Sequence, residues 1–138
     1  ERGDPYQAHI EETVRLVMEA IGHSHPHVVC YQSKVGKAEW LQPSTENTIK
    51  KLAAEDVKDM LVVPIAFVSD HSETLYELDM LLKDVALAAG VKKYMRMPSL
   101  NSSPRFINAL AELVRKKTQQ HEDELSLFPR LSWQEMAV

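Results

Sequence analysis

The stretch that decides the fold is Pro64–Asp79, which reads PIAFVSDHSETLYELD. It joins the second half of an apolar run, Met60–Phe67, to an acidic segment that begins at Ser69. The run is apolar at successive positions, as expected for a parallel strand that helices cover on both faces. We therefore predict a buried strand at 60–67 that presents polar side chains at its carboxyl end.

Helix and strand patterns alternate on both sides of this stretch. In chain order, the predicted elements are a helix at 5–21, a strand at 27–32, a helix from 44, the strand at 60–67, a helix at 72–89, a strand at 94–97 and a helix from 104. Asp4 and Ser44 are suitable helix caps, and Gly22 and Gly90 are suitable helix ends. The alternation predicts an α/β protein with a three-layer α/β/α arrangement around a parallel sheet.

Three polar loops follow the predicted strands, after Gln32, Phe67 and Met97. Ligands of open α/β sheets bind outside the carboxyl ends of the strands. We therefore expect these loops to converge on one site. Residues 1–118 are predicted to form the α/β lobe, and residues 119–138 a polar tail, since the composition turns polar from Lys116 onward.

The composition excludes several classes of protein. The chain has 138 residues, of which 44% are hydrophobic and 26% charged, so it can bury a core and is not disordered. Its net charge of -4 predicts no nucleic-acid partner. The single cysteine, Cys30, excludes an intrachain disulfide and an all-cysteine metal cluster. No apolar run approaches the roughly 20 residues that span a bilayer.

Two carboxylates follow the central strand at helical spacing. Glu77 lies four residues after Glu73, so both occupy one helix face, and His71 precedes them. Like charges at this spacing repel, so a divalent cation is one plausible partner, and ferrous iron suits carboxylate and imidazole ligands. The alternative is an acidic helix start that the helix dipole stabilises, with Glu77 in solvent.

A second polar loop combines amide, hydroxyl and ammonium groups with a large ring. Gln32, Ser33 and Lys34 leave the predicted strand, and Trp40 follows. Together they suit a flat ligand that carries carboxylates. The alternative is an ordinary loop whose tryptophan packs on the core. Two other features are weaker: the alternate histidines in 23–27 favour a solvated connection over a metal site, and Cys30 favours a buried, inert thiol.

Five runs of the sequence together resemble the ferrochelatase family, over about residues 2–115. They are Gly3–Tyr6 (GDPY), Gln32–Gly36 (QSKVG) with Trp40 and Leu41, Val63–Phe67 (VPIAF), Ser69–Asp79 (SDHSETLYELD), and Ser99–Asn101 (SLN) with Pro104 and Phe106. The run from Ser69 to Asp79 is the most specific of them. The resemblance implies a chelatase-like lobe, the C-terminal of two similar α/β lobes that enclose a porphyrin cleft.

The resemblance also implies an activity, a lyase reaction of heme biosynthesis. Ferrous iron is the substrate, inserted into protoporphyrin or, in some bacteria, coproporphyrin, without an organic cofactor. The match makes His71 and Glu73 catalytic and adds Glu77 to the metal path, on a helix with a π-type turn. It places Ser33 and Trp40 at positions that line the porphyrin site, and their loop gives four predicted porphyrin-binding residues. These are Gln32, Ser33, Lys34 and Trp40.

Three departures from the family pattern matter. Leu81 stands where many relatives carry a third acid, and a cysteine cluster for an iron–sulfur centre is missing. The N-terminal lobe and its active-site histidine are also missing, so we expect this chain alone to be inactive. The expected partners are porphyrin, ferrous iron and that lobe. We expect a bacterial cytoplasmic location, with any membrane contact made by the missing part.

Two other functions remain open from the sequence. One is a non-catalytic piece that binds metal or porphyrin. The other is a chelatase that acts on another tetrapyrrole with cobalt or nickel. The run Ser69–Asp79 favours iron and heme over the latter.

Overall fold

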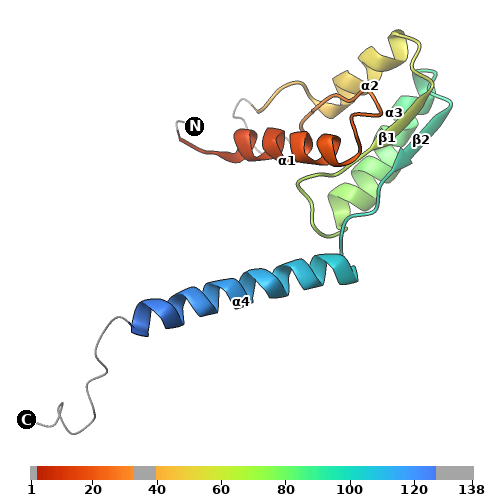
Figure 1. Cartoon of the computed structure of the whole chain (residues 1–138). Coiled ribbons are helices and arrows are strands. Elements are labelled where there is room, and N and C mark those ends of the chain that lie inside the picture. Colours follow the sequence, from red (N-terminus) through yellow and green to blue (C-terminus); the bar gives the residue numbers. More distant parts are fainter. Residues whose placement is uncertain (1–2, 33–39, 127–138) are drawn as a thin grey trace, which may run out of the picture. The chain divides into compact units, whose positions relative to one another are not determined.

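The computed structural model describes residues 3–32 and 40–126 of the chain (Figure 1). Their elements are α1 (Tyr6–Ala20), α2 (Thr45–Ala54), β1 (Asp59–Val62), the π-helix η1 (Glu73–Leu81), α3 (Leu82–Ala88), β2 (Lys93–Arg96) and α4 (Pro104–Ser126). The chain divides into one compact unit that ends at Asn101 and a second unit that begins at Ser102. Among the described residues, none of the helices has the length and apolar character needed to cross a lipid bilayer.

The first unit is built on a small parallel sheet. β1 and β2 pair in parallel, with Asp59 opposite Lys93 and Val62 opposite Arg96. The predicted α/β class with a parallel sheet is thereby confirmed, and β2 lies within one residue of the predicted strand. In sequence β1 is followed by η1 and α3 and then by β2, so the helices form the crossover that a parallel pair requires.

The predicted strand at 60–67 is shorter than expected. β1 ends at Val62, and the next residues form turns in which the amide of Ile65 donates to the carbonyl of Val63. Pro64 has no backbone N–H to give to a sheet, which explains why the ladder stops beside it. The apolar residues beyond Val62 therefore line the approach to the polar loop and do not extend the strand.

The predicted strand at 27–32 was wrong. Within the described residues this segment forms only an isolated parallel bridge between Tyr31 and Ser44. The amide of Tyr31 donates to the carbonyl of Pro43, and the amide of Thr45 donates to the carbonyl of Tyr31. β-branched and aromatic residues favour a strand only where a neighbouring strand pairs with them. Here the segment meets the start of α2 instead.

The core lies between the sheet and the helices that follow it. Side chains at four-residue spacing along η1 and α3 form its centre and are almost fully buried. Thr74 is 0% exposed, Leu78 3%, Leu82 5% and Ala86 0%. The three apolar members of this repeat pack with Ile49 and Ala53 of α2, Met60 and Tyr94 of the sheet, and Val91, which precedes β2. The strict four-residue repeat fixes which face of η1 points inward.

The helix predicted over 72–89 is present as η1 followed directly by α3 (green in Figure 1). Its first turn is α-like, with the amide of Leu75 bonded to the carbonyl of His71. Farther on, the amide of Leu82 donates to the carbonyl of Glu77, a five-residue step that defines a π-helix. The π-type turn that the family resemblance implied is therefore present.

The predicted helix ends at Ser44, Gly22 and Gly90 are confirmed, whereas the N-cap of α1 is Pro5, one residue after the predicted Asp4. Asp4 Oδ1 accepts a hydrogen bond from the amide of Tyr6, and Ser44 Oγ accepts one from the amide of Asn47. Gly22 and Gly90 have positive φ angles of 68° and 99°. This backbone region favours glycine, so both residues end their helices for the expected reason.

The second unit contains α4, which runs from Pro104 to Ser126. The predicted boundary between residues 118 and 119 falls inside this helix, and it remains a prediction. The last part of the predicted tail, residues 127–138, lies outside the described residues.

Candidate active site

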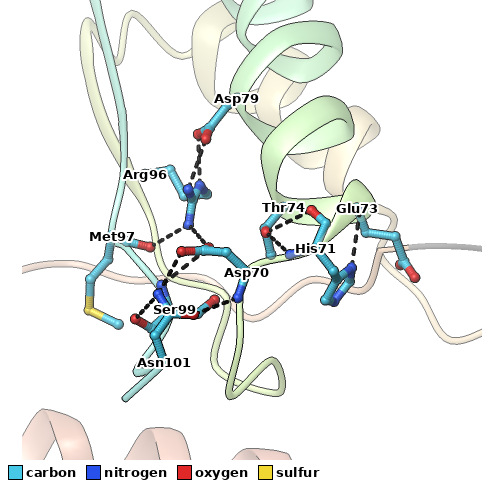
Figure 2. Close-up of polar contacts among 9 residues, drawn as sticks. All are labelled: Asp70, His71, Glu73, Thr74, Asp79, Arg96, Met97, Ser99 and Asn101. Atoms are coloured by element: carbon cyan, nitrogen blue, oxygen red, sulfur yellow. Dashed lines mark hydrogen bonds and ion pairs between the residues drawn. The ribbon is translucent and has the colours of Figure 1, made fainter. Parts of the chain in front are cut away.

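The loop between β1 and η1 is anchored at Asp70. Asp70 Oδ2 accepts a hydrogen bond from Asn101 Nδ2 at 2.8 Å, and the Asp70 amide donates to Asn101 Oδ1 at 2.9 Å. The amide of Ser99 donates to Asp70 Oδ1 at 3.4 Å. Figure 2 shows these contacts below Arg96, with His71 and Glu73 directed away from them. The segment 99–101 therefore holds the start of the predicted site in place.

His71 is fixed by the first turn of η1. Its amide donates to Thr74 Oγ1 at 2.9 Å, and that hydroxyl donates to the His71 carbonyl at 3.0 Å. The ring nitrogen Nδ1 accepts a hydrogen bond from the amide of Glu73 at 3.2 Å, so the neutral ring carries its proton on Nε2. The edge of the ring meets Phe67, with ring centroids 4.4 Å apart. The imidazole is thus held in one orientation.

Glu73 and Glu77 share the face of η1 that adjoins its buried face. Each immediately precedes a buried residue, Thr74 or Leu78, and each is partly buried. The next position on this face is Leu81, which is 45% exposed. The sequence prediction that both carboxylates lie on one helix face is therefore confirmed, and the face continues with an apolar residue.

The loop after the first predicted strand meets this acidic face. Gln32 Nε2 donates a hydrogen bond to Glu77 Oε2 at 2.7 Å, across 45 residues of sequence. Trp40 Nε1 donates to the carbonyl of Gln32 at 3.0 Å. The polar loop that begins at Gln32 and the acidic helix that carries Glu77, which the sequence presented as two separate candidate sites, are therefore in contact. Ser33 and Lys34, the other two predicted porphyrin ligands, lie outside the described residues.

A pocket of about 220 Å³ opens beside this junction. It is lined by Tyr31, Gln32, Trp40, Leu41, Gln42, Ser44, Thr45, Glu46 and Leu82. Two aromatic rings and two leucines form the apolar part of this lining, and the other side chains are polar or charged. The pocket gives the predicted ligand loop a concave surface next to Glu77.

Sequence reasoning missed the most strongly bonded side chain of this region, Arg96. Its Nε and Nη2 donate to the two carboxylate oxygens of Asp79 at 2.7 and 2.8 Å, and its Nη1 donates to Asp70 Oδ1 at 2.7 Å. Nη1 also donates to the carbonyl of Met97 at 3.1 Å. The Arg96 side chain is 7% exposed. Nothing in the sequence around Arg96 indicates that its side chain contacts Asp70 and Asp79, which lie on other segments of the chain.

The polar contacts of Asp70 change its acidity. The hydrogen bond from Asn101, with smaller contributions from Ser99 and Arg96, lowers the pKa of Asp70 from 3.8 to about 2. The hydrogen bond to Asp79 is the main cause that raises the pKa of Arg96. Both groups are therefore charged near neutral pH.

This shift predicts an acid-dependent loss of stability. Because the pKa of Asp70 is lower in the folded state, its ionised form stabilises the fold above about pH 4, and this contribution disappears as the pH falls toward 2. We expect Asp70→Asn to flatten that part of the curve of unfolding free energy against pH. Denaturant unfolding at a series of pH values measures it, with the exposed Asp84→Asn as control. Parallel curves for Asp70→Asn and the wild type would contradict the assignment.

The described residues contain no group of three or more His, Cys, Asp or Glu side chains placed to hold a metal ion together. His71, Glu73 and Glu77 therefore do not form a closed ligand set in this structure. His23, His25 and His27 are exposed, as expected for the predicted solvated connection. Cys30 is only partly buried, so the prediction of a buried thiol was too strong.

Comparison with known proteins adds the family context. A model of the ferrochelatase family matches residues 1–118. A ferrochelatase from Trichodesmium erythraeum is 46% identical over 97% of this chain, and one from Citrifermentans bemidjiense is 52% identical over 83% of it. A ferrochelatase from Synechococcus elongatus is 45% identical over 94%. This chain covers 37%, 36% and 34% of these relatives, so it spans about a third of their length.

Proposed function

The chain belongs to the ferrochelatase family, and from this membership we propose that it is the C-terminal part of an enzyme that inserts ferrous iron into a porphyrin. The observation that carries the proposal is the 2.7 Å hydrogen bond between Gln32 and Glu77. It joins the loop that we assign to the porphyrin with the acidic helix that we assign to the metal. A reaction that unites these two substrates needs such a junction.

We assign porphyrin binding to the loop that contains Gln32, Ser33, Lys34 and Trp40. The indole of Trp40 offers a flat apolar surface for the macrocycle, and the ammonium of Lys34 suits a propionate. Support comes from the pocket beside Gln32 and Trp40. The tetrapyrrole is protoporphyrin or coproporphyrin under this proposal.

We assign the metal and proton steps to His71, Glu73 and Glu77. Insertion removes two protons from the pyrrole nitrogens and strips water from the iron. Carboxylates in a line accept protons and pass a divalent ion toward the macrocycle without binding it tightly. Imidazole transfers protons efficiently near neutral pH, so His71 suits the proton relay. The fixed orientation of His71 and the shared face of the two glutamates support these roles.

We further propose that this chain alone does not turn over. This proposal is supported by the extent of the chain, which spans about a third of the length of its relatives. The N-terminal lobe with its histidine completes the site in this proposal. In this proposal iron is a substrate of the reaction, and the reaction needs no organic cofactor and no iron–sulfur cluster. The reaction is assigned to the lyase class and to the bacterial cytoplasm.

The test is an anaerobic insertion assay with the full-length protein that carries this sequence. We expect loss of porphyrin fluorescence and growth of the heme spectrum when ferrous iron is added, and no turnover by residues 1–138 alone. Parallel assays with cobalt and nickel and with other tetrapyrroles measure the competing chelatase functions. Porphyrin binding without insertion of iron would contradict the proposal and favour a binding protein.

A further inference from the structure

Two side chains of β2 make hydrogen bonds to neighbouring residues of η1, and neither side chain has a role in the proposed reaction. Tyr94 and Arg96 are alternate residues of the strand and therefore lie on one face of it. The hydroxyl of Tyr94 donates a hydrogen bond to the carbonyl of Leu78 at 2.9 Å, and Arg96 donates two hydrogen bonds to Asp79. One strand face thus holds two successive residues in the middle of the π-helix.

Arg96 also reaches the other end of the site. Through Asp70 it holds the residue just before His71, and through Asp79 it holds a residue two positions after Glu77. A single guanidinium therefore fixes both ends of the segment 70–79, as the dashed contacts in Figure 2 show. The pairing with Asp79 uses the planar fork of the guanidinium, a geometry that an ammonium group does not reproduce.

A π-helix needs such external contacts because its hydrogen bonds are less regular than those of an α-helix. The five-residue step shifts the side chains of η1 relative to an α-helical path. Tyr94 gives the Leu78 carbonyl an additional donor, and burial raises the pKa of the tyrosine to about 12, so it stays protonated. Glu77 accepts its hydrogen bond from Gln32 within this helix, so a change of the helical step would change where Glu77 lies relative to Gln32.

We propose that Arg96 is a positioning residue for iron insertion, which sets the direction of His71, Glu73 and Glu77 by holding Asp70 and Asp79. Arg96 acts through its hydrogen bonds to Asp70 and Asp79, and therefore through the π-helix and the loop that precedes it. This role rests on the proposed function and extends it to a residue buried beneath the reacting groups.

The test replaces Arg96 by lysine in the full-length protein. Arg96→Lys keeps the positive charge but loses the fork. We expect kcat to fall by about 10-fold or more, because small displacements of reacting groups are costly, while the KM for porphyrin stays unchanged. The control is Arg15→Lys, which alters an exposed arginine paired with Glu12 and Glu19 and is expected to leave both constants unchanged.

A second variant tests the same contact if Arg96→Lys does not fold properly. Asp79 is 37% exposed, so Asp79→Asn removes the partner charge at a site that tolerates change. If both residues act as one unit, the double variant loses no more kcat than the worse single variant. Turnover numbers are divided by the folded fraction, measured by circular dichroism in the same samples.

The possible results distinguish a failure of the role proposed for Arg96 from a failure of the proposed function. Wild-type kcat per folded molecule in Arg96→Lys and Asp79→Asn would show a structural role only and overturn the inference. A rise in KM with unchanged kcat would overturn it as well. A wild-type protein that binds porphyrin but inserts no iron would instead overturn the proposed function.

Discussion

Replacing Glu73 by glutamine lowers the kcat of iron insertion by at least about 100-fold, the lower range for loss of a general acid–base group. The amide has the shape of the carboxylate but neither accepts a pyrrole proton nor neutralises a divalent ion. Glu73 begins η1, and its backbone amide already donates a hydrogen bond to the ring of His71. That hydrogen bond uses the backbone and is retained in the variant.

Steady-state insertion under anaerobic conditions measures this effect in the full-length protein. The matched control is Glu112→Gln on α4, which alters an exposed glutamate paired with Lys116. We expect the control to retain wild-type kcat. Activity of Glu73→Gln within a few-fold of the wild type would remove Glu73 from the mechanism.

Truncating Leu78 to alanine reduces the free energy of unfolding by about 3 kcal/mol, within the range for buried leucines. Leu78 is 3% exposed and lies at the centre of the four-residue repeat that packs η1 on the sheet. The loss combines the removed apolar contacts with a cavity between helix and sheet. Because Leu78 follows Glu77 directly, the cavity also loosens the face that carries the carboxylates.

Denaturant unfolding of the full-length protein measures this loss. The control is Leu78→Met, which nearly conserves volume and is expected to cost less than about 1.5 kcal/mol. Equal stability of the alanine and methionine variants would contradict the placement of Leu78 in the core. So would an alanine variant as stable as the wild type.

Much of the fold follows from local signals in the sequence. The cap at Ser44 and the glycine ends at Gly22 and Gly90 depend only on neighbouring residues, and all three were predictable. The shared face of Glu73 and Glu77 follows from helical spacing alone. The π-helix, by contrast, was implied by the family resemblance and not by the spacing.

The errors and omissions came from contacts between distant residues. The segment 27–32 has strand-forming residues, but pairing requires a neighbour, and Tyr31 meets Ser44 instead. The bond between Gln32 and Glu77 and the contacts of Arg96 span 45, 26 and 17 residues of sequence. No local pattern marks such partners, because the packing of the core decides which side chains meet.

We propose that the acidic face of η1, and not the porphyrin loop, carries out the insertion step. The most direct test of this claim is single-turnover insertion of ferrous iron into porphyrin already bound to the full-length protein, for the double variant Glu73→Gln/Glu77→Gln. We predict wild-type porphyrin affinity with insertion slowed by at least about 100-fold. Insertion at the wild-type rate from the preloaded complex would contradict the claim.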